Sequence, residues 1–320
     1  EPEPEPGYIL ITVIVYDENG QPQYVELQMS EETLNPNYPY TLSKWIMNQF
    51  RADNNLYTGD IKKISLENST AVKILGYEVF YDFSYLEEVH LGDNLTEIDG
   101  YAFDNCRRLE TINGNFDNLE KIGDGAFDNC RKLQTINLLF GKKLHTIGEN
   151  AFSQCYKVNE YIDLSNTKVT RIEEYTFSEC KLTKGANLNN GVINYIGEKA
   201  FYEFGYSFCA QTNYPPWRNG TSIEYGVAPN FYTPIPYNPS QAETLESTQN
   251  GLQSQHPLYT TEFVISLPSS ITYIYSDAFN DVYYKRCYIE MESSLLDYFG
   301  ITENTWQQFR TNSWNEILIF

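Results

Sequence analysis

The sequence predicts an α/β solenoid, which is an elongated stack of about seven coils of ~24 residues each, closed by a cap at either end. Three observations predict this fold. A phrase of the form Ile-x4-Phe-x2-Cys-x2-Leu returns along most of the 320 residues, its apolar positions keep nearly the same spacing in each copy, and segments without it stand at both ends. One copy cannot bury its own apolar face, so stacked copies must form the core.

The copies follow one another at an almost constant interval. The Ile position is filled in turn by Leu75, Ile98, Ile122, Ile147, Ile172, Ile196 and Ile274. The Phe position holds Phe80, Phe103, Phe127, Phe152, Phe177, Phe201 and Phe279, with a small residue, usually Ala, directly before it. The first six Ile positions are 23 to 25 residues apart, within the range of leucine-rich repeats. The pattern therefore predicts a right-handed leucine-rich repeat superhelix.

Each unit predicts a short strand, a turn and a helical turn. Segments such as 109–113 and 133–138 alternate apolar and polar residues and are expected to form strands with their apolar side chains inward. The Ala-Phe-x-x-Cys stretch is expected to form a helical turn on the opposite side of the coil. Its Phe should fill the middle of the coil.

The N-terminal segments lack the phrase. Residues 1–6 alternate Glu and Pro and predict an extended spacer. Residues 7–69 predict a β-rich cap, with a hairpin whose strands are 9–16 and 24–29 around an Asn-Gly turn. Thr41 or Ser43 is expected to begin a short helix through Phe50, with Trp45 and Ile46 on its apolar side. Such a cap would cover the open end of the stack.

The solenoid is assigned to residues 70–291, with an insertion at about 206–261. Ile196 and Ile274 are 78 residues apart, and seven of the fourteen prolines lie in the insertion. We expect it to combine a degenerate repeat with loops. Strands at 262–267 and 287–291 should then resume the stack. Residues 292–320, with a helix to about residue 310 and an apolar strand at 317–320, predict the C-terminal cap.

Charge and hydropathy exclude two classes of partner. The formal net charge is −21, and so acidic a surface repels phosphate backbones, so no nucleic-acid partner is expected. The longest apolar run, at 8–16, is too short to span a bilayer as a helix. No transmembrane segment is therefore expected.

Four cysteines stand at the same place in successive copies, so a metal site or disulfides must be considered. They are Cys106, Cys130, Cys155 and Cys180. A straight ladder of thiols cannot form the tetrahedral ligand set of zinc, and parallel Cβ vectors disfavour disulfides. Phe83, Phe204 and Val282 fill the same place in other copies. We therefore expect buried free thiols, no metal site and no cofactor.

No catalytic constellation stands out. The three histidines, His90, His145 and His256, have no Cys, Ser or Asp partner placed by the repeat. A phosphate-binding loop is absent from the sequence. A carboxylate pair for glycoside hydrolysis is the weakest of the alternatives, because no spacing recommends one. The sequence therefore predicts a protein that is not an enzyme.

Two groups of residues are candidate binding sites. The first is the outward column of the sheet, which holds His90, Asn113, Asn137, Asp163 and Asn187. It is either a solvated face with ladders of side-chain amides or a concave binding surface. The second is a set of aromatic residues in the insertion, which either packs onto the solenoid or forms a platform for sugars or peptides. Its members are Tyr214, Trp217, Tyr225, Phe231, Tyr232 and Tyr237.

The phrase, best seen at 122–133 and 147–158, resembles the BspA-type leucine-rich repeat of bacterial surface proteins. The resemblance covers roughly residues 61–205 and 262–291. It implies an exported protein that lies at the cell surface, is anchored to the outer membrane or is secreted, with a lipid anchor upstream of residue 1 as one means of attachment. The family motif carries no set of binding residues.

Together these observations predict a non-catalytic cell-surface binding or adhesion protein. It would recognise a host or bacterial surface protein, or a glycan, through the solenoid or its insertion. The alternative is a structural surface protein with no discrete ligand, and a carboxylate-dependent hydrolase comes third.

Overall fold

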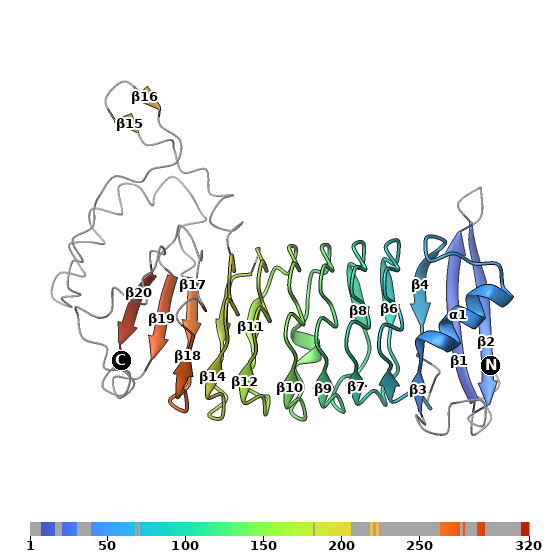
Figure 1. Cartoon of the computed structure of the whole chain (residues 1–320), viewed down its shortest axis with the longest axis horizontal. Helices are drawn as coiled ribbons and strands as arrows, with labels where there is room; N and C mark the ends of the chain where they lie inside the picture. Colours follow the sequence, from blue (N-terminus) through green and yellow to red (C-terminus); the bar gives the residue numbers. More distant parts are fainter. Residues whose placement is uncertain are drawn as a thin grey trace.

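The computed structural model describes residues 8–16, 21–30, 40–67, 69, 71–181, 183–205, 218–219, 222–223, 263–275, 278, 287–291 and 315–319. In Figure 1 the coils stand side by side in one long row, with the N-terminal strands at one end. Parallel strands link each coil to the next. The predicted leucine-rich repeat solenoid is therefore confirmed.

One sheet runs along the first half of the row. Its order is β2 (Pro22–Ser30), β1 (Tyr8–Tyr16), β4 (Ile61–Ser65), β6 (Glu88–His90) and β8 (Thr111–Asn113). The first two strands form the predicted antiparallel hairpin, and β1 also pairs antiparallel with β4. From β4 onward the pairing is parallel, as stacked coils require.

A sheet of the same kind runs along the second half. It contains β11 (Tyr161–Asp163), β13 (Gly185–Asn187), β17 (Phe263–Ser266), β19 (Cys287–Met291) and β20 (Asn315–Ile319), all parallel. The strands predicted at 262–267, 287–291 and the C-terminus are confirmed. Because β13 pairs directly with β17, the stack continues across the insertion, in which β15 (Arg218–Asn219) and β16 (Ser222–Ile223) form a small antiparallel pair.

The Ile positions form two further sheets of two-residue strands. The first contains β3 (Thr41–Leu42), β5 (Ile74–Leu75), β7 (Glu97–Ile98), β9 (Lys121–Ile122) and β10 (Thr146–Ile147). The second contains β12 (Arg171–Ile172), β14 (Tyr195–Ile196) and β18 (Tyr273–Ile274). Leu42 pairs in register with Leu75, so the N-terminal segment contributes a position to this column that the sequence did not reveal.

The segment predicted as a strand at 133–138 is not one. Residues Asn137–Leu139 form a 3-10 helix, η2, and the sheet of β8 stops there. Ile136 and Leu139 are still fully buried. Leu138, which the pattern placed inward, is only partly buried, because Leu139 takes the buried position. The apolar pattern was therefore right about Ile136, and wrong about Leu138 and the backbone.

The Ala-Phe-x-x-Cys stretch is not helical either. It consists of successive turns, such as Cys106 N–H to Phe103 O, and its alternate N–H groups donate to the next coil, as Phe103 N–H does to Ala126 O. In every described copy the third and seventh residues after the Ile position have positive φ, as Tyr101 and Asn105 do. These left-handed residues turn alternate backbone groups toward the neighbouring coil.

The helix α1 (Lys44–Asp53) begins where the sequence predicts. Ser43 is its N-cap, and the Ser43 hydroxyl accepts a hydrogen bond from Ile46 N–H at 3.4 Å. Ile46, Met47 and Phe50 are buried. Trp45, which we expected on the apolar side, is exposed, because the packed face is formed by these other three residues.

The core is a row of stacked phenylalanine rings. Phe80, Phe103, Phe127, Phe152, Phe177 and Phe201 are all fully buried. Successive ring centroids are 5.1 to 5.7 Å apart, and the three central pairs are nearly parallel. One ring per coil therefore fills the interior, as predicted.

Several expectations fall outside the described residues. These are the spacer at 1–6, the hairpin turn at 17–20, the helix near 302–310, His256, Phe279 and Val282. The total of seven coils and the two caps as separate units therefore stay predictions.

Candidate functional site

The outward column of the sheet exists, but it is interrupted. Strand register aligns His90 with Asn113, and Asp163 with Asn187. Between these pairs lies Asn137, which belongs to η2 and not to a strand. The predicted residues therefore form two short columns, separated where the sheet breaks.

Side chains of these columns are engaged mostly within the chain. His90 Nδ1 lies 3.6 Å from Glu67 Oε2, and Asn113 Nδ2 donates to Glu88 Oε1 at 3.1 Å. Asp163 Oδ1 accepts the Ser165 N–H, and Asn187 Oδ1 accepts the Asn189 N–H. The described contacts do not join these residues in the predicted amide ladder. Their internal bonds weaken the case for this face as the main binding surface.

Asn137 bridges the break in the sheet. Its Nδ2 donates to Tyr161 O at 2.6 Å, and its Oδ1 accepts the Asp163 N–H at 3.0 Å. In return, Glu160 Oε1, which belongs to the same coil as Tyr161, accepts the backbone N–H groups of Ile136 and Asn137. Burial raises the pKa of Glu160, and these two N–H donors oppose the rise. One amide and one carboxylate thus replace the ladder bonds that a strand would make.

The four cysteines form a second, buried ladder. Each thiol donates to the carbonyl of the Phe in the preceding coil, at sulfur–oxygen distances of 3.2 to 3.3 Å. All four are free and fully buried, as predicted, and burial raises the pKa of each thiol well above its usual range. A buried, protonated thiol is a poor nucleophile, so this ladder is structural.

Carboxylates also meet between coils. Asp104 and Asp128 belong to neighbouring coils, and Oδ1 of Asp128 is buried without a hydrogen-bond partner among the described residues. Burial, followed by the charge of Asp128, raises the pKa of Asp104 to about 6. The described residues contain no group of three or more His, Cys, Asp or Glu side chains arranged to hold a metal ion.

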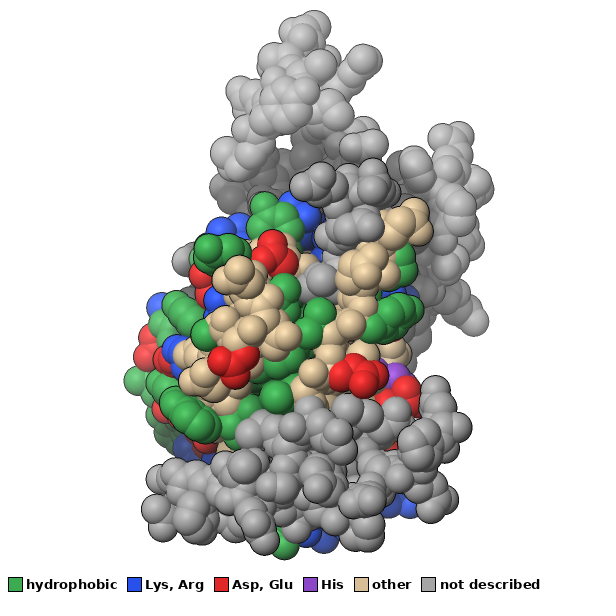
Figure 2. Space-filling model, turned by 90° about the vertical axis from the view of Figure 1, so that its right-hand side faces the viewer, with side chains coloured by type: hydrophobic (Ala, Val, Ile, Leu, Met, Phe, Trp, Pro, Cys, Tyr) green, Lys and Arg blue, Asp and Glu red, His purple; other side chains and the backbone are tan. Residues whose placement is uncertain are grey.

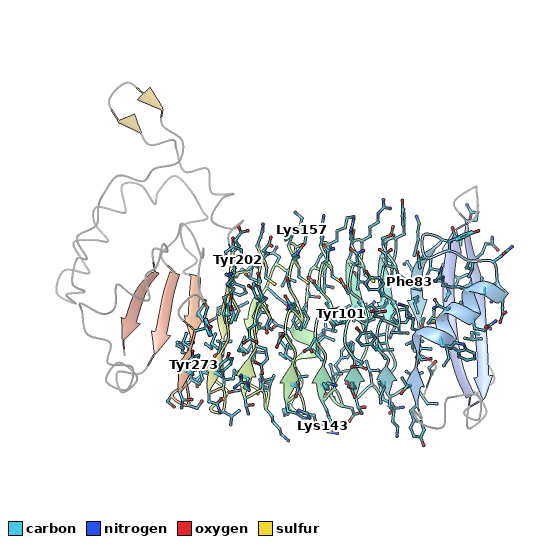
Figure 3. The ribbon with its side chains drawn as sticks, viewed as in Figure 1. Phe83, Tyr101, Lys143, Lys157, Tyr202 and Tyr273 are labelled. Carbon is cyan, nitrogen blue, oxygen red and sulfur yellow. The ribbon has the colours of Figure 1, made fainter. Side chains whose placement is uncertain are left out.

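Exposed aromatic side chains gather on the turn side of the first coils. We call Tyr77, Tyr81 and Tyr101, together with Trp45 of the adjoining helix α1, the aromatic face; in chain order, Trp45, Tyr77, Tyr81 and Tyr101 are 66%, 55%, 41% and 37% exposed. Tyr77 and Tyr101 pack edge to face at 5.6 Å, and Lys44 Nζ lies 5.2 Å from the centre of the Tyr81 ring while pairing with Glu78. Figure 3 shows Tyr101 on the solenoid at mid-height.

Glycines make room for this face. The Tyr101 ring lies over Gly125, where an added Cβ would come within 2.6 Å of it, and Gly125 has a φ of +59°. The Tyr77 ring lies over Gly100 in the same way, at 3.4 Å. Tyr77 and Tyr101 thus each lean over the next coil, and their two rings meet there.

The sequence matches a protein-family model over much of the solenoid. The BspA type leucine rich repeat region matches in six copies over residues 52–160 and 115–210. The chain belongs to the BspA-type leucine-rich repeat family. A search of the curated proteins found no match.

Solved leucine-rich repeat structures resemble the chain at low identity. A leucine rich repeat protein of T. pallidum is 20% identical, with 46% of this chain and 78% of that chain covered and a TM-score of 0.37. A leucine-rich repeat protein of Bacteroides ovatus is 15% identical, with coverages of 82% and 85% and a TM-score of 0.22. A leucine rich cell surface protein of Faecalibacterium prausnitzii is 14% identical, with coverages of 96% and 93% and a TM-score of 0.25.

The BspA-type repeat explains the core residues and leaves the exposed ones unexplained. The aromatic face was missed in the sequence because Trp45 was assigned to the buried side of its helix and the tyrosines lie between motif positions. The one available signal was the Gly-x-Gly at 123–125, which marks a crowded surface. The predicted aromatic residues of the insertion, including Trp217, lie outside the described residues. None of the described helices is long and apolar enough to cross a membrane.

Proposed function

We propose that this chain is a non-catalytic binding or adhesion protein of the bacterial cell surface, which recognises a protein or glycan through the outer faces of its solenoid. Membership of the family supports this proposal, because BspA-type repeats are typical of exported bacterial surface proteins. Repeat solenoids typically serve as binding scaffolds whose core is structural. The described interior, with stacked phenylalanines and protonated thiols, is consistent with a purely structural core, which leaves binding to the outer faces.

The aromatic face carries the proposal. Trp and Tyr dominate the binding energy of protein interfaces, and they are also amphipathic enough to remain exposed in the free protein. The three tyrosines stand on coils whose backbones are hydrogen-bonded to one another, and Trp45 stands on helix α1, so little conformational entropy is lost when a ligand orders these side chains. Figure 2, seen from the N-terminal end, shows hydrophobic side chains at the described surface among acidic and basic ones.

The test is an array of host-matrix proteins and glycans probed with three proteins. These are the wild type, a face variant with Trp45→Ala, Tyr77→Ala and Tyr101→Ala, and a control with Tyr24→Ala, Tyr161→Ala and Tyr273→Ala. The control removes three exposed tyrosines that lie on other parts of the solenoid. We expect the face variant to lose at least tenfold in affinity and the control to keep it. An equal loss in both would remove the aromatic face from the proposal.

The sheet-face residues are a second candidate contact surface. His90 and Asp163 would act as its hydrogen-bonding groups, since Asp163 is exposed and His90 is half-buried beside Glu67. Replacing both with Ala on the same array distinguishes this surface from the aromatic face. An array on which the wild type binds nothing would favour a structural surface protein without a discrete ligand.

A further inference from the structure

Cations gather along one long edge of this acidic protein. Each coil turns there, directly after its Cys position, and three successive coils place Arg107 and Arg108, then Arg131 and Lys132, then Lys157 at that turn. All five are exposed. We call them the basic ridge; Figure 3 shows Lys157 on this edge and Lys143 on the opposite edge. With a net charge of −21 over the whole chain, a run of five cations on one edge needs a physical reason.

The arginine side chains of the basic ridge are held in place by neutral groups and not by carboxylates. Arg107 Nε donates to Asn105 Oδ1 at 2.7 Å, and Arg131 Nε donates to Asn129 Oδ1 at 2.6 Å. Arg108 lies over the Tyr85 ring at 4.2 Å. Among the described residues, these three guanidinium groups have no carboxylate within ion-pair distance, and nor does Lys157.

Carboxylates do occur at the margins of the ridge. Lys132 pairs with Glu110 at 2.8 Å. Beyond the last ridge coil, Lys181 pairs with both Glu179 and Glu203. The positive charge without a carboxylate partner is therefore that of Arg107, Arg108, Arg131 and Lys157, all of them exposed.

The ridge is also held at a fixed spacing. Asn129 Nδ2 donates to Asn105 Oδ1 at 2.7 Å, so the two amides that orient the arginines are themselves joined from coil to coil. The backbone is tied at the same level, because Asn105 N–H donates to Asp128 O. Neighbouring coils are roughly 5 Å apart, as paired strands are. The arginines therefore present their outer N–H groups in parallel, one coil after another.

We propose that the basic ridge binds a linear acidic polysaccharide, one that carries sulfate or carboxylate groups on successive sugars. A guanidinium fork fits a planar or tetrahedral oxyanion in a bidentate manner. The Tyr85 and Tyr156 rings lie under Arg108 and Arg131, at 4.2 and 5.7 Å, and help to hold these two guanidinium groups in place. A row of anions spaced along sugars matches a row of cations spaced along coils.

Duplex nucleic acid fits this edge less well. It carries a charge for about every 1.7 Å of its axis, a denser array than the ridge can neutralise. Its width would also bring its phosphates toward the carboxylates at the margins of the ridge, which are Glu110 beside Lys132 and the Glu179 and Glu203 pair around Lys181. The acidic remainder of the protein thus selects a thin, less densely charged polymer.

The proposal is independent of the aromatic face, because the two surfaces share no residue. The experiment measures binding of the full chain to a size-defined heparin oligosaccharide, with neutral dextran and a DNA duplex of equal charge as comparison probes. The ridge variant is Arg107→Gln with Arg131→Gln. The matched control is Lys142→Gln with Lys143→Gln, which removes the same charge from exposed positions on the opposite edge. A third variant, Lys157→Gln, alters a side chain with no described contact and so cannot disturb folding through one.

We expect salt-sensitive binding to heparin, a loss of about tenfold in the ridge variant, and a salt dependence that becomes shallower by roughly one unit for each cation removed. The control should bind within twofold of the wild type, and Lys157→Gln should lie between the two. Three results would overturn the proposal: no binding of heparin by the wild type, equal losses in ridge and control variants, or tighter binding of DNA than of heparin. Binding on the glycan and protein array by the aromatic face would be unaffected by any of them.

Discussion

Replacing Asn137 with Ala tests how the solenoid continues across the break in its sheet. The substitution removes the side chain that donates to Tyr161 O and accepts the Asp163 N–H, while Ile136 stays in the core. The matched control is Asn113→Ala, in the same outward position of an intact strand. Asn113 makes its described bond to the side chain of Glu88 and not to the backbone.

The expected cost follows from the bonds that are lost. A hydrogen bond contributes about 0.5–1.5 kcal/mol to the free energy of unfolding, so two contribute about 1–3 kcal/mol. Asn137 is partly exposed, and water can replace part of what is lost. We therefore expect a loss of about 1.5 kcal/mol for Asn137→Ala. Asn113→Ala should cost less than about 0.5 kcal/mol, as exposed side-chain pairs do.

Urea unfolding followed by circular dichroism measures the global effect, and hydrogen exchange measures the local one. In Asn137→Ala the amide proton of Asp163 should exchange faster than in the wild type, because its acceptor is gone. Amides of β6 and β8 should be unchanged. Equal stabilities of the two variants, or an unchanged Asp163 amide, would refute the idea that the Asn137 side chain replaces the missing strand.

Three further predictions follow from the interior and from the carboxylate pair. Phe127→Ala should lower the free energy of unfolding by about 3–5 kcal/mol in urea titrations, because it empties the centre of the ring stack; a loss below about 1 kcal/mol would contradict the packing. Native Cys155 should resist iodoacetamide at pH 8 and react in denaturant, as read by peptide mapping, because burial raises the pKa of its thiol; rapid native labelling would contradict the ladder. The pKa of Asp104 is raised to about 6, so its neutral form is favoured in the folded state and its stabilising contribution is lost as pH rises through about 6. Asp104→Asn should therefore be more stable than the wild type at pH 7.5, by about 1 kcal/mol after solvent screening of this half-buried group, and no more stable at pH 4; the opposite pH trend would show the sign to be wrong.

The sequence predicted the interior well because the interior is periodic. The Phe and Cys positions recur at a constant interval, and a side chain that fills a coil must be apolar in every coil. Phe127 and Cys130 were placed from spacing alone, and both are fully buried. The core of a solenoid is therefore readable from a single chain.

The backbone conformation of the turns could not be predicted from the sequence. Ala-Phe-x-x-Cys looks helical, yet positions such as Glu78, Tyr101 and Lys199 adopt positive φ. Such residues rarely do so, and the cost of roughly 1–2 kcal/mol each must be offset by hydrogen bonds between coils. Those bonds join residues more than twenty positions apart, so a local sequence pattern cannot predict them.

The break at Asn137 and the exposed surfaces escaped prediction for a similar reason. Residues 133–138 carry a good strand pattern, and Glu160 from the next coil accepts the N–H groups that a strand would have used. The basic ridge combines Arg107 and Arg131, 24 positions apart, which only the stacking of coils brings together. The strongly negative net charge of the whole chain gave no indication of such a local group of cations.

The central claim is that a structural core carries binding surfaces on its outside, and the array measurement tests this most directly. The account predicts that the variant of Trp45, Tyr77 and Tyr101 keeps the circular dichroism spectrum of the folded wild type and loses at least tenfold in affinity for the captured ligand. Retained affinity in that variant, alongside lost affinity in the control variant of Tyr24, Tyr161 and Tyr273, would contradict it.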